Sequence, residues 1–175
     1  DKASRYFSSV LVADLIIAGV LLLVSSIITF NIEFILNVPE NLVDSVKILF
    51  ALTFATFIIS VITAIFTTAA FVKNKLYINS LRDIASNTLK LLLVVILFSF
   101  FHAKYFLAMA SLASGIFLLL TNIKVKKKIL PEVKMNFNLF SFKLVKVLIS
   151  AGIWSSIGYL ITALNRGLDL LICNL

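Results

Sequence analysis

The 175-residue chain has one cysteine, one histidine, five glycines and two prolines. The lone Cys173 excludes a disulfide framework within the chain, and the lone His102 excludes a histidine-rich metal site. Five scattered glycines cannot form a glycine-rich phosphate loop, and HExxH, CxxC and GxSxG motifs are absent. No paired acids, and no serine with a base, stand at a catalytic spacing. We therefore expect neither enzyme activity nor an organic cofactor.

Charge is also scarce, since 14% of the residues are charged and 61% are hydrophobic. A helix that rises ~1.5 Å per residue needs ~20 residues to cross ~30 Å of hydrocarbon. Five apolar runs approach or exceed that length, at residues 9–30, 46–72, 84–101, 103–123 and 144–164. The third and fourth are separated only by His102, so the chain must reverse near residues 102–104. The sequence predicts an all-α, polytopic transmembrane helix bundle with five spans.

The net charge of +8 follows the predicted topology. Basic residues concentrate in alternate connections, with two in residues 1–8, three in residues 73–83 and seven lysines in residues 124–146. The other side has only Lys47 and Lys104. The positive-inside rule predicts a multi-pass protein of the cytoplasmic membrane with a cytoplasmic amino terminus. These lysines flank apolar spans and lack the interleaved aromatics of a single-strand groove, so we expect no nucleic-acid partner.

Three parts are predicted along the chain: four helices of an amino-terminal lobe (1–123), a basic cytoplasmic linker (124–143) and the first helix of a second lobe (144–175). The linker carries lysines, a proline and three phenylalanines. This composition suits a segment lying along the anionic inner membrane surface, with its rings at the lipid headgroups. The chain has no initiator methionine and stops in an apolar stretch, so we expect a piece of a larger protein whose remaining helices are its partners.

Polar side chains recur along the predicted helices. In the second run five hydroxyls at steps of three and four share one face: Thr53, Thr56, Ser60, Thr63 and Thr67. The fifth run repeats the pattern with Ser155, Tyr159, Thr162, Arg166 and Asp169. Such rows serve close helix packing, with interhelical hydrogen bonds of ~0.6 kcal/mol each, or they line a pathway. Packing is sufficient to explain the hydroxyls alone.

Ionisable residues in the spans favour a pathway, because a charge there costs at least ~2.5 kcal/mol. Asp14 has no partner nearby in the sequence, which favours a cavity or ion-coupling role. Lys90 can snorkel to the cytoplasmic interface, although it shares a stripe with Asn87 that points toward the bundle. Arg166 and Asp169 can pair with each other, so a structural ion pair remains as good an explanation as a functional one. The candidate pathway residues are Asp14, Lys90, Arg166, Asp169, Thr56, Ser60, Thr63 and Tyr159.

Three segments resemble one family in order along the chain. Residues 144–175, LVKVLISAGIWSSIGYLITALNRGLDLLICNL, resemble the seventh membrane helix of the polysaccharide flippase (Wzx-like) family. Residues 37–49, NVPENLVDSVKIL, resemble its external loop and the start of its fourth helix. Residues 124–134, KVKKKILPEVK, resemble the cytoplasmic connection between its two lobes. The chain would then correspond to helices three to seven of that family.

The resemblance implies a MATE-like fold, in which two bundles surround a central cavity that opens alternately to each side and flips a lipid-linked oligosaccharide. It implies that Lys90 and Arg166 attract the pyrophosphate, while Asp14 or Asp169 carries a coupling proton or sodium ion. An antiporter of the same fold for drugs or metabolites is an alternative, and its cavity would be acidic. A non-transporting membrane subunit or a membrane-bound polysaccharide polymerase is another, and its stripes would bury one another without a cleft.

Overall fold

The computed structural model describes residues 2–35, 39–100 and 105–150. These residues form helices without strands, which confirms the all-α membrane-bundle prediction. The elements are α1 (Lys2–Phe30), α2 (Ile32–Ile35), η1 (Glu40–Leu42), α3 (Val43–Val72), α4 (Leu76–Phe100), α5 (Phe106–Ile129) and η2 (Phe137–Leu139), and residues 142–150 are also helical.

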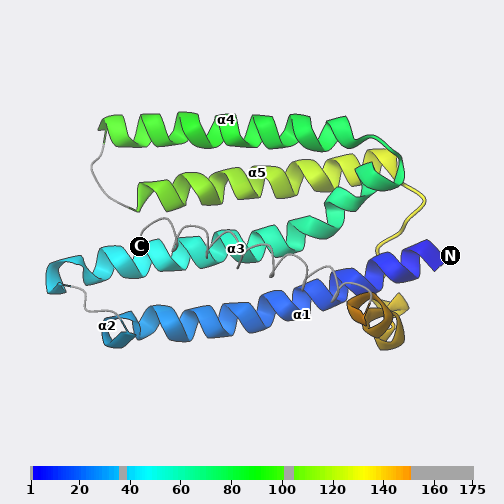
Figure 1. The fold of residues 1–175 in the computed structure, drawn as a ribbon, viewed down its shortest axis with the longest axis horizontal. Helices are drawn as coiled ribbons and strands as arrows, with labels where there is room; N and C mark the ends of the chain where they lie inside the picture. Colours follow the sequence, from blue (N-terminus) through cyan, green and yellow to red (C-terminus); the bar gives the residue numbers. More distant parts are fainter. Residues whose placement is uncertain (1, 36–38, 101–104, 151–175) are drawn as a thin grey trace, which may run out of the picture.

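The four long helices lie side by side in the order α1, α3, α5, α4 (Figure 1). They alternate in direction along the chain, so α4 and α5 form an antiparallel hairpin that folds back against α3. The neighbours α3 and α5 consequently run parallel, although they are not consecutive. Residues 142–150 lie beside the start of α1 and are seen closer to end-on in the same view.

Three of these helices, α1, α3 and α5, are long and apolar enough to cross a membrane. Leu23 and Ile27 on α1 and Leu91 on α4 are each 65% exposed, so large apolar side chains point outward, as in a bundle surrounded by lipid. The third predicted span forms most of α4, which carries Asp83 and Lys90. The reversal at 102–104, and the fifth span from residue 151 onward, lie outside the described residues.

The helices extend beyond the apolar runs that predict them. α1 begins at Lys2, α4 begins at Leu76, and α5 continues through its lysines to Ile129. Lysines in the last turn of α5 complement the negative end of the helix dipole, which favours this extension. The polar ends of these helices therefore extend beyond the apolar runs, on the side where basic residues concentrate.

A Schellman motif ends α3. Asn74 adopts a left-handed conformation with φ of 52°, and its N–H donates to the carbonyl of Phe71 at 3.0 Å. The N–H of Lys75 donates to the carbonyl of Ala70 at 2.8 Å. Asparagine tolerates this backbone shape better than most residues, so it performs the role that glycine usually has. The chain thereby reverses within three residues into α4.

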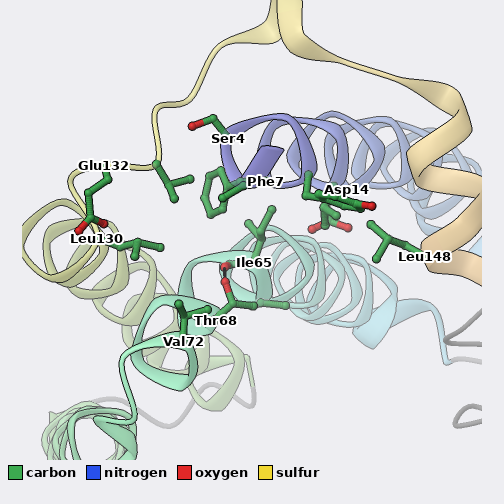
Figure 2. A pocket seen from close by; sticks show the side chains of 14 residues that line it. Ser4, Phe7, Asp14, Ile65, Thr68, Val72, Leu130, Glu132 and Leu148 are labelled. Carbon is green, nitrogen blue, oxygen red and sulfur yellow. Dashed lines mark hydrogen bonds between the residues drawn. The ribbon is translucent and has the colours of Figure 1, made fainter. Parts of the chain in front are cut away.

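The main buried apolar cluster lies at the end of the bundle that contains the amino terminus. Figure 2 shows Phe7 of α1, Ile65 of α3 and Leu130 directed toward one another. Phe66 meets Phe7 edge to face, with ring centroids 5.9 Å apart. Val133 completes the cluster from the segment after α5. The linker therefore contributes to the core.

Residues 130–141, here named the strap, are held on α1 by hydroxyl groups. The backbone N–H groups of Lys134, Asn136 and Ser141 donate to serine oxygens of α1 at 3.2, 3.1 and 3.0 Å. Those serines are Ser4, Ser8 and Ser9, all of them buried. The sequence predicts a linker that lies along the membrane surface, whereas in the structure its inner side is docked on the protein.

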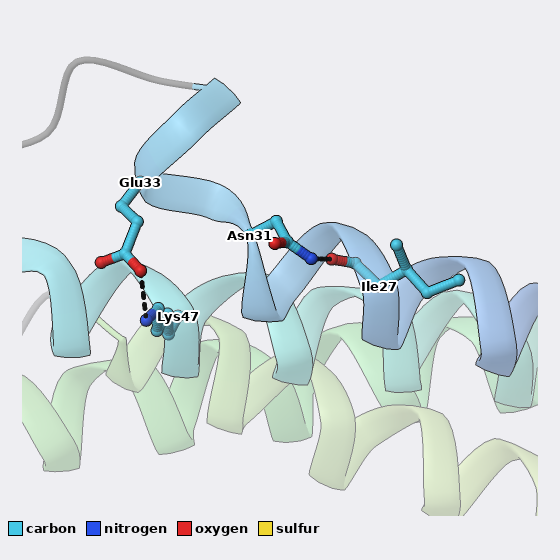
Figure 3. A network of polar contacts seen from close by, with 4 residues as sticks. All are labelled: Ile27, Asn31, Glu33 and Lys47. Atoms are coloured by element: carbon cyan, nitrogen blue, oxygen red, sulfur yellow. Dashed lines mark hydrogen bonds and ion pairs between the residues drawn. The ribbon is translucent and has the colours of Figure 1, made fainter.

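At the opposite end, two polar contacts of the described residues are shown in Figure 3. Lys47 of α3 and Glu33 of α2 form an ion pair at 3.6 Å, and the Asn31 side chain donates to the carbonyl of Ile27 at 2.8 Å (Figure 3). An exposed pair of this kind contributes about 0–1 kcal/mol. The three basic connections of the sequence analysis all lie at the other end, and the third of them contains the strap.

Candidate functional site

The predicted row of hydroxyls on α3 is present, and every member hydrogen-bonds to its own helix. The donors reach carbonyls three or four residues back at 2.7 to 2.8 Å, from Thr53, Thr56, Ser60, Thr63 and Thr67. The row therefore does not provide the interhelical hydrogen bonds that packing alone would use. Each oxygen keeps acceptor capacity for a second partner.

Three polar stripes meet where α3, α4 and α5 adjoin. Two contiguous cavities of about 470 and 300 Å³ open there and share Thr56, Ser60, Lys90 and Ser111. We name this pair of cavities the hydroxyl groove. Its further polar lining residues are Thr53, Thr63, Thr67, Ser86, Asn87 and Ser114. The structure thus brings together four of the predicted pathway residues, Thr56, Ser60, Thr63 and Lys90.

Small residues allow the walls of the groove to approach. The Ser86 hydroxyl of α4 donates to the carbonyl of Ser114 on α5 at 3.2 Å, which links the two helices of the hairpin. A Cβ atom on Gly115 would lie 3.7 Å from Ile59 and 3.8 Å from Thr56, so α5 packs directly on α3. Such small side chains are what lets membrane helices come close without a polar core.

Lys90 is the only cation among the described residues that line the hydroxyl groove. It is half-buried, and within the described part of the chain it has no ion pair. An ammonium group with three donors that faces a cavity of hydroxyls suits an anionic oxygen ligand. Lys90 therefore lies in the wall of the groove, beside the α3 hydroxyls.

Asp14 lies in a different and larger cavity, of about 710 Å³, between α1, α3, the strap and residues 142–150 (Figure 2). Glu132 is the other acid of the lining, and the described lining contains no Lys or Arg. Most of the remaining wall is apolar, including Phe7, Ile65 and Leu148. This cavity therefore has the opposite charge sign to the hydroxyl groove.

The two cavities lie apart: α1 and the strap line the Asp14 cavity but not the hydroxyl groove, and Ala64 of α3 is the one described residue common to both linings. Asp14 and Lys90 consequently do not share a site in this structure. Three more predicted pathway residues, Tyr159, Arg166 and Asp169, lie outside the described residues. No group of three or more metal-ligating side chains occurs in the part of the chain that the structure describes.

Two buried cations were not predicted by the sequence. Arg82 on α4 is buried, its Nε donates to the carbonyl of Ile78, and burial lowers its pKa while neighbouring Asp83 raises it. Lys126 on α5 is 4% exposed and donates to the carbonyl of Val133. Both residues stand in basic stretches that resemble solvated flanks. Only their helical register, which continues past the apolar run, could have indicated burial.

Comparison with known proteins supports the assignment to the membrane. The chain is 31% identical over 176 residues to the "Uncharacterized membrane protein EpsK" of Bacillus subtilis (strain 168). The present chain is a helical membrane protein. The match covers 100% of the chain and 35% of that relative, so the chain spans about a third of the length of the curated protein it matches. No protein-family model matches the chain, and no solved structure matches it.

Proposed function

We propose that the chain is part of a transporter of the polysaccharide flippase family, with a MATE-like fold, that moves a lipid-linked oligosaccharide across the cytoplasmic membrane by alternating access. The observation that carries the proposal is the hydroxyl groove, a polar cavity with a half-buried lysine on a bundle of apolar helices. Ionisable residues in membrane spans usually face a cavity or a partner and mark a substrate or ion path.

The groove offers two kinds of recognition. The α3 hydroxyls direct their hydrogens to their own helix, as Thr56 does to Leu52 at 2.8 Å, so their oxygens can accept hydrogen bonds from sugar hydroxyls. Lys90 can donate charge-assisted hydrogen bonds to a pyrophosphate. The combination of neutral acceptors with one cation fits a sugar attached to an anionic carrier better than it fits a cationic drug.

A second candidate is an antiporter for cationic drugs or metabolites. It is favoured by the cavity that Asp14 lines, since a carboxylate in a largely apolar lining attracts a cationic group. In a flippase the same Asp14 would instead carry a coupling proton or sodium ion. The two candidates differ in which cavity holds the cargo.

The proposal predicts that Lys90→Ala in the complete protein lowers export of surface polysaccharide about tenfold or more. The reason is that a hydrogen bond to a charged group contributes about 1.5–3 kcal/mol. Lys90→Arg should retain most export, because it keeps the charge. Export is measured in cells, with protein abundance in the membrane checked by immunoblot.

Matched variants separate the alternatives. Lys124→Ala removes an exposed lysine outside the groove and should leave export unchanged. Asp14→Asn and Arg166→Ala should each depress export, the first by loss of ion coupling and the second by loss of anion binding. Normal export in Lys90→Ala, Asp14→Asn and Arg166→Ala would mean that these charges are structural. Loss of cation efflux with normal polysaccharide export would favour the antiporter.

A further inference from the structure

The strap has two different sides. Its inner side places Leu130 and Val133 in the buried cluster, where each is 7% exposed. Its outer side presents Phe137, which is 64% exposed, and the next segment begins with Phe142, which is 73% exposed. Exposed phenylalanines beside a membrane-spanning bundle suit insertion among lipid headgroups.

The backbone that carries these rings is fixed. Three amide groups of the strap donate to buried serine oxygens on α1, and the turn at Phe137–Leu139 is capped by the Asn136 side chain, which accepts from the N–H of Asn138 at 3.0 Å. The outer surface of the strap is therefore ordered before any ligand binds to it. A ligand that binds it does not bear the free-energy cost of ordering a loose loop.

The same surface is uniformly positive. The exposed lysines around it are Lys127, Lys128, Lys134, Lys143 and Lys146. The one acid of the strap, Glu132, is paired at 3.0 Å with Lys73, the residue that follows α3. Its negative charge is thus offset by an exposed lysine, and no other acid of the strap opposes an approaching anion.

The surface lies at the end of the bundle where α1 starts and α5 ends, and both helices are long and apolar enough to cross a membrane. We therefore expect it at the level of the lipid headgroups. Phenylalanines next to lysines at such a boundary combine insertion at the interface with attraction to anionic lipid. A nucleic acid or an acidic protein as partner would account for the lysines but not for the exposed phenylalanines beside them.

We propose that the outer side of the strap, with Phe137, Phe142 and the five lysines, is a preorganised docking surface for the headgroups of anionic phospholipids. The three serines of α1 hold it in place, so they act as positioning residues. The inference rests on the membrane location and the strap geometry, and it does not depend on what the protein transports.

The test uses the full-length protein in neutral detergent, titrated with phosphatidylglycerol or phosphatidylcholine while thermal unfolding is followed. Phosphatidylglycerol should raise the unfolding midpoint and phosphatidylcholine should not. One lysine at an anionic surface contributes roughly fivefold in affinity, so Lys143→Gln combined with Lys146→Gln should raise the half-saturating concentration roughly 25-fold at low salt. Phe137→Ser combined with Phe142→Ser should also weaken the response.

The opposite end of the bundle provides the control. Phe34 on α2 is 84% exposed but stands at the opposite end from the basic connections, so Phe34→Ser should leave the lipid response unchanged. If the phenylalanine variant does not fold, the lysine variant still decides, because it alters only exposed side chains. An equal midpoint shift with polyglutamate or inorganic phosphate, or an unchanged lipid response in the lysine variant, would overturn the proposal.

Discussion

At the scale of single residues, Lys126 shows how a cation is accommodated inside this bundle. Its ammonium group donates to the carbonyl of Val133 and lies 4.8 Å from the centre of the Phe7 ring. A carbonyl dipole and an aromatic face thus take the place of a carboxylate. One lysine of α5 therefore joins two other parts of the chain, α1 and the strap.

Replacing this lysine should loosen the junction. Lys126→Met keeps most of the side-chain length but leaves the Val133 carbonyl without its donor, which costs about 1–3 kcal/mol. Thermal unfolding of the full-length protein in detergent should show a lower midpoint. Lys127→Met, which changes the exposed neighbour, should shift the midpoint little, and equal shifts in the two variants would contradict this account.

At the scale of elements, the hydroxyls of α1 and α3 are used in opposite ways. Those of α3 donate to their own helix and remain available at the wall of a cavity, as Ser60 does to the carbonyl of Phe57. Those at the start of α1 accept hydrogen bonds from another segment, as Ser8 does from Asn136. Residues of the same type therefore line a groove in one helix and fasten a chain segment in another.

The fastening can be measured through hydrogen exchange. Ser8→Ala removes the acceptor of the Asn136 amide, and a hydrogen bond contributes about 1 kcal/mol, so the strap amides should exchange roughly fivefold faster. Ser26→Ala is the matched control, because the Ser26 hydroxyl only bonds its own helix at 2.8 Å and should not alter exchange in the strap. Unchanged exchange in Ser8→Ala would show that apolar contacts alone hold the strap.

At the scale of the whole molecule, charge is segregated between the two ends. The amino terminus, the α3–α4 turn and the segment after α5 lie together and are basic, while α2 and η1 at the other end carry Glu33 and Glu40. This arrangement satisfies the topology that the positive-inside rule requires. The basic end is expected to face the cytoplasm.

Labelling of single cysteines in intact cells tests that orientation. In a cysteine-free form of the complete protein, Glu40→Cys should react with a membrane-impermeant maleimide added outside, and Lys75→Cys should react only after the cells are opened. Both side chains are exposed, so a difference in labelling reports the side of the membrane and not burial. The reverse pattern would invert the topology.

Sequence reasoning found the long helices because apolar runs of membrane length leave few alternatives. Helical spacing also placed Thr56, Ser60 and Thr63 on one face of a helix, and the structure brings Lys90 of α4 to the same groove. Sequence reasoning did not find the packing order of α3, α5 and α4, because a helix in lipid has apolar residues all round and hence no single inward side. The docking of the strap on Ser8 was missed for another reason: these hydroxyls accept from backbone amides, which have no sequence signature.

The parallel contact between α3 and α5 affects how the protein is made. When α3 leaves the ribosome, the helix that will cover its hydroxyl face has not yet been synthesised, and α4 must pass first. Newly inserted α3 therefore depends on the insertion machinery, or on lipid alone, to shield Thr56 and its neighbours until α5 arrives. The hydroxyl face of α3 is thus covered only after the whole α4–α5 hairpin has been made, which is later than in a bundle whose consecutive helices pair.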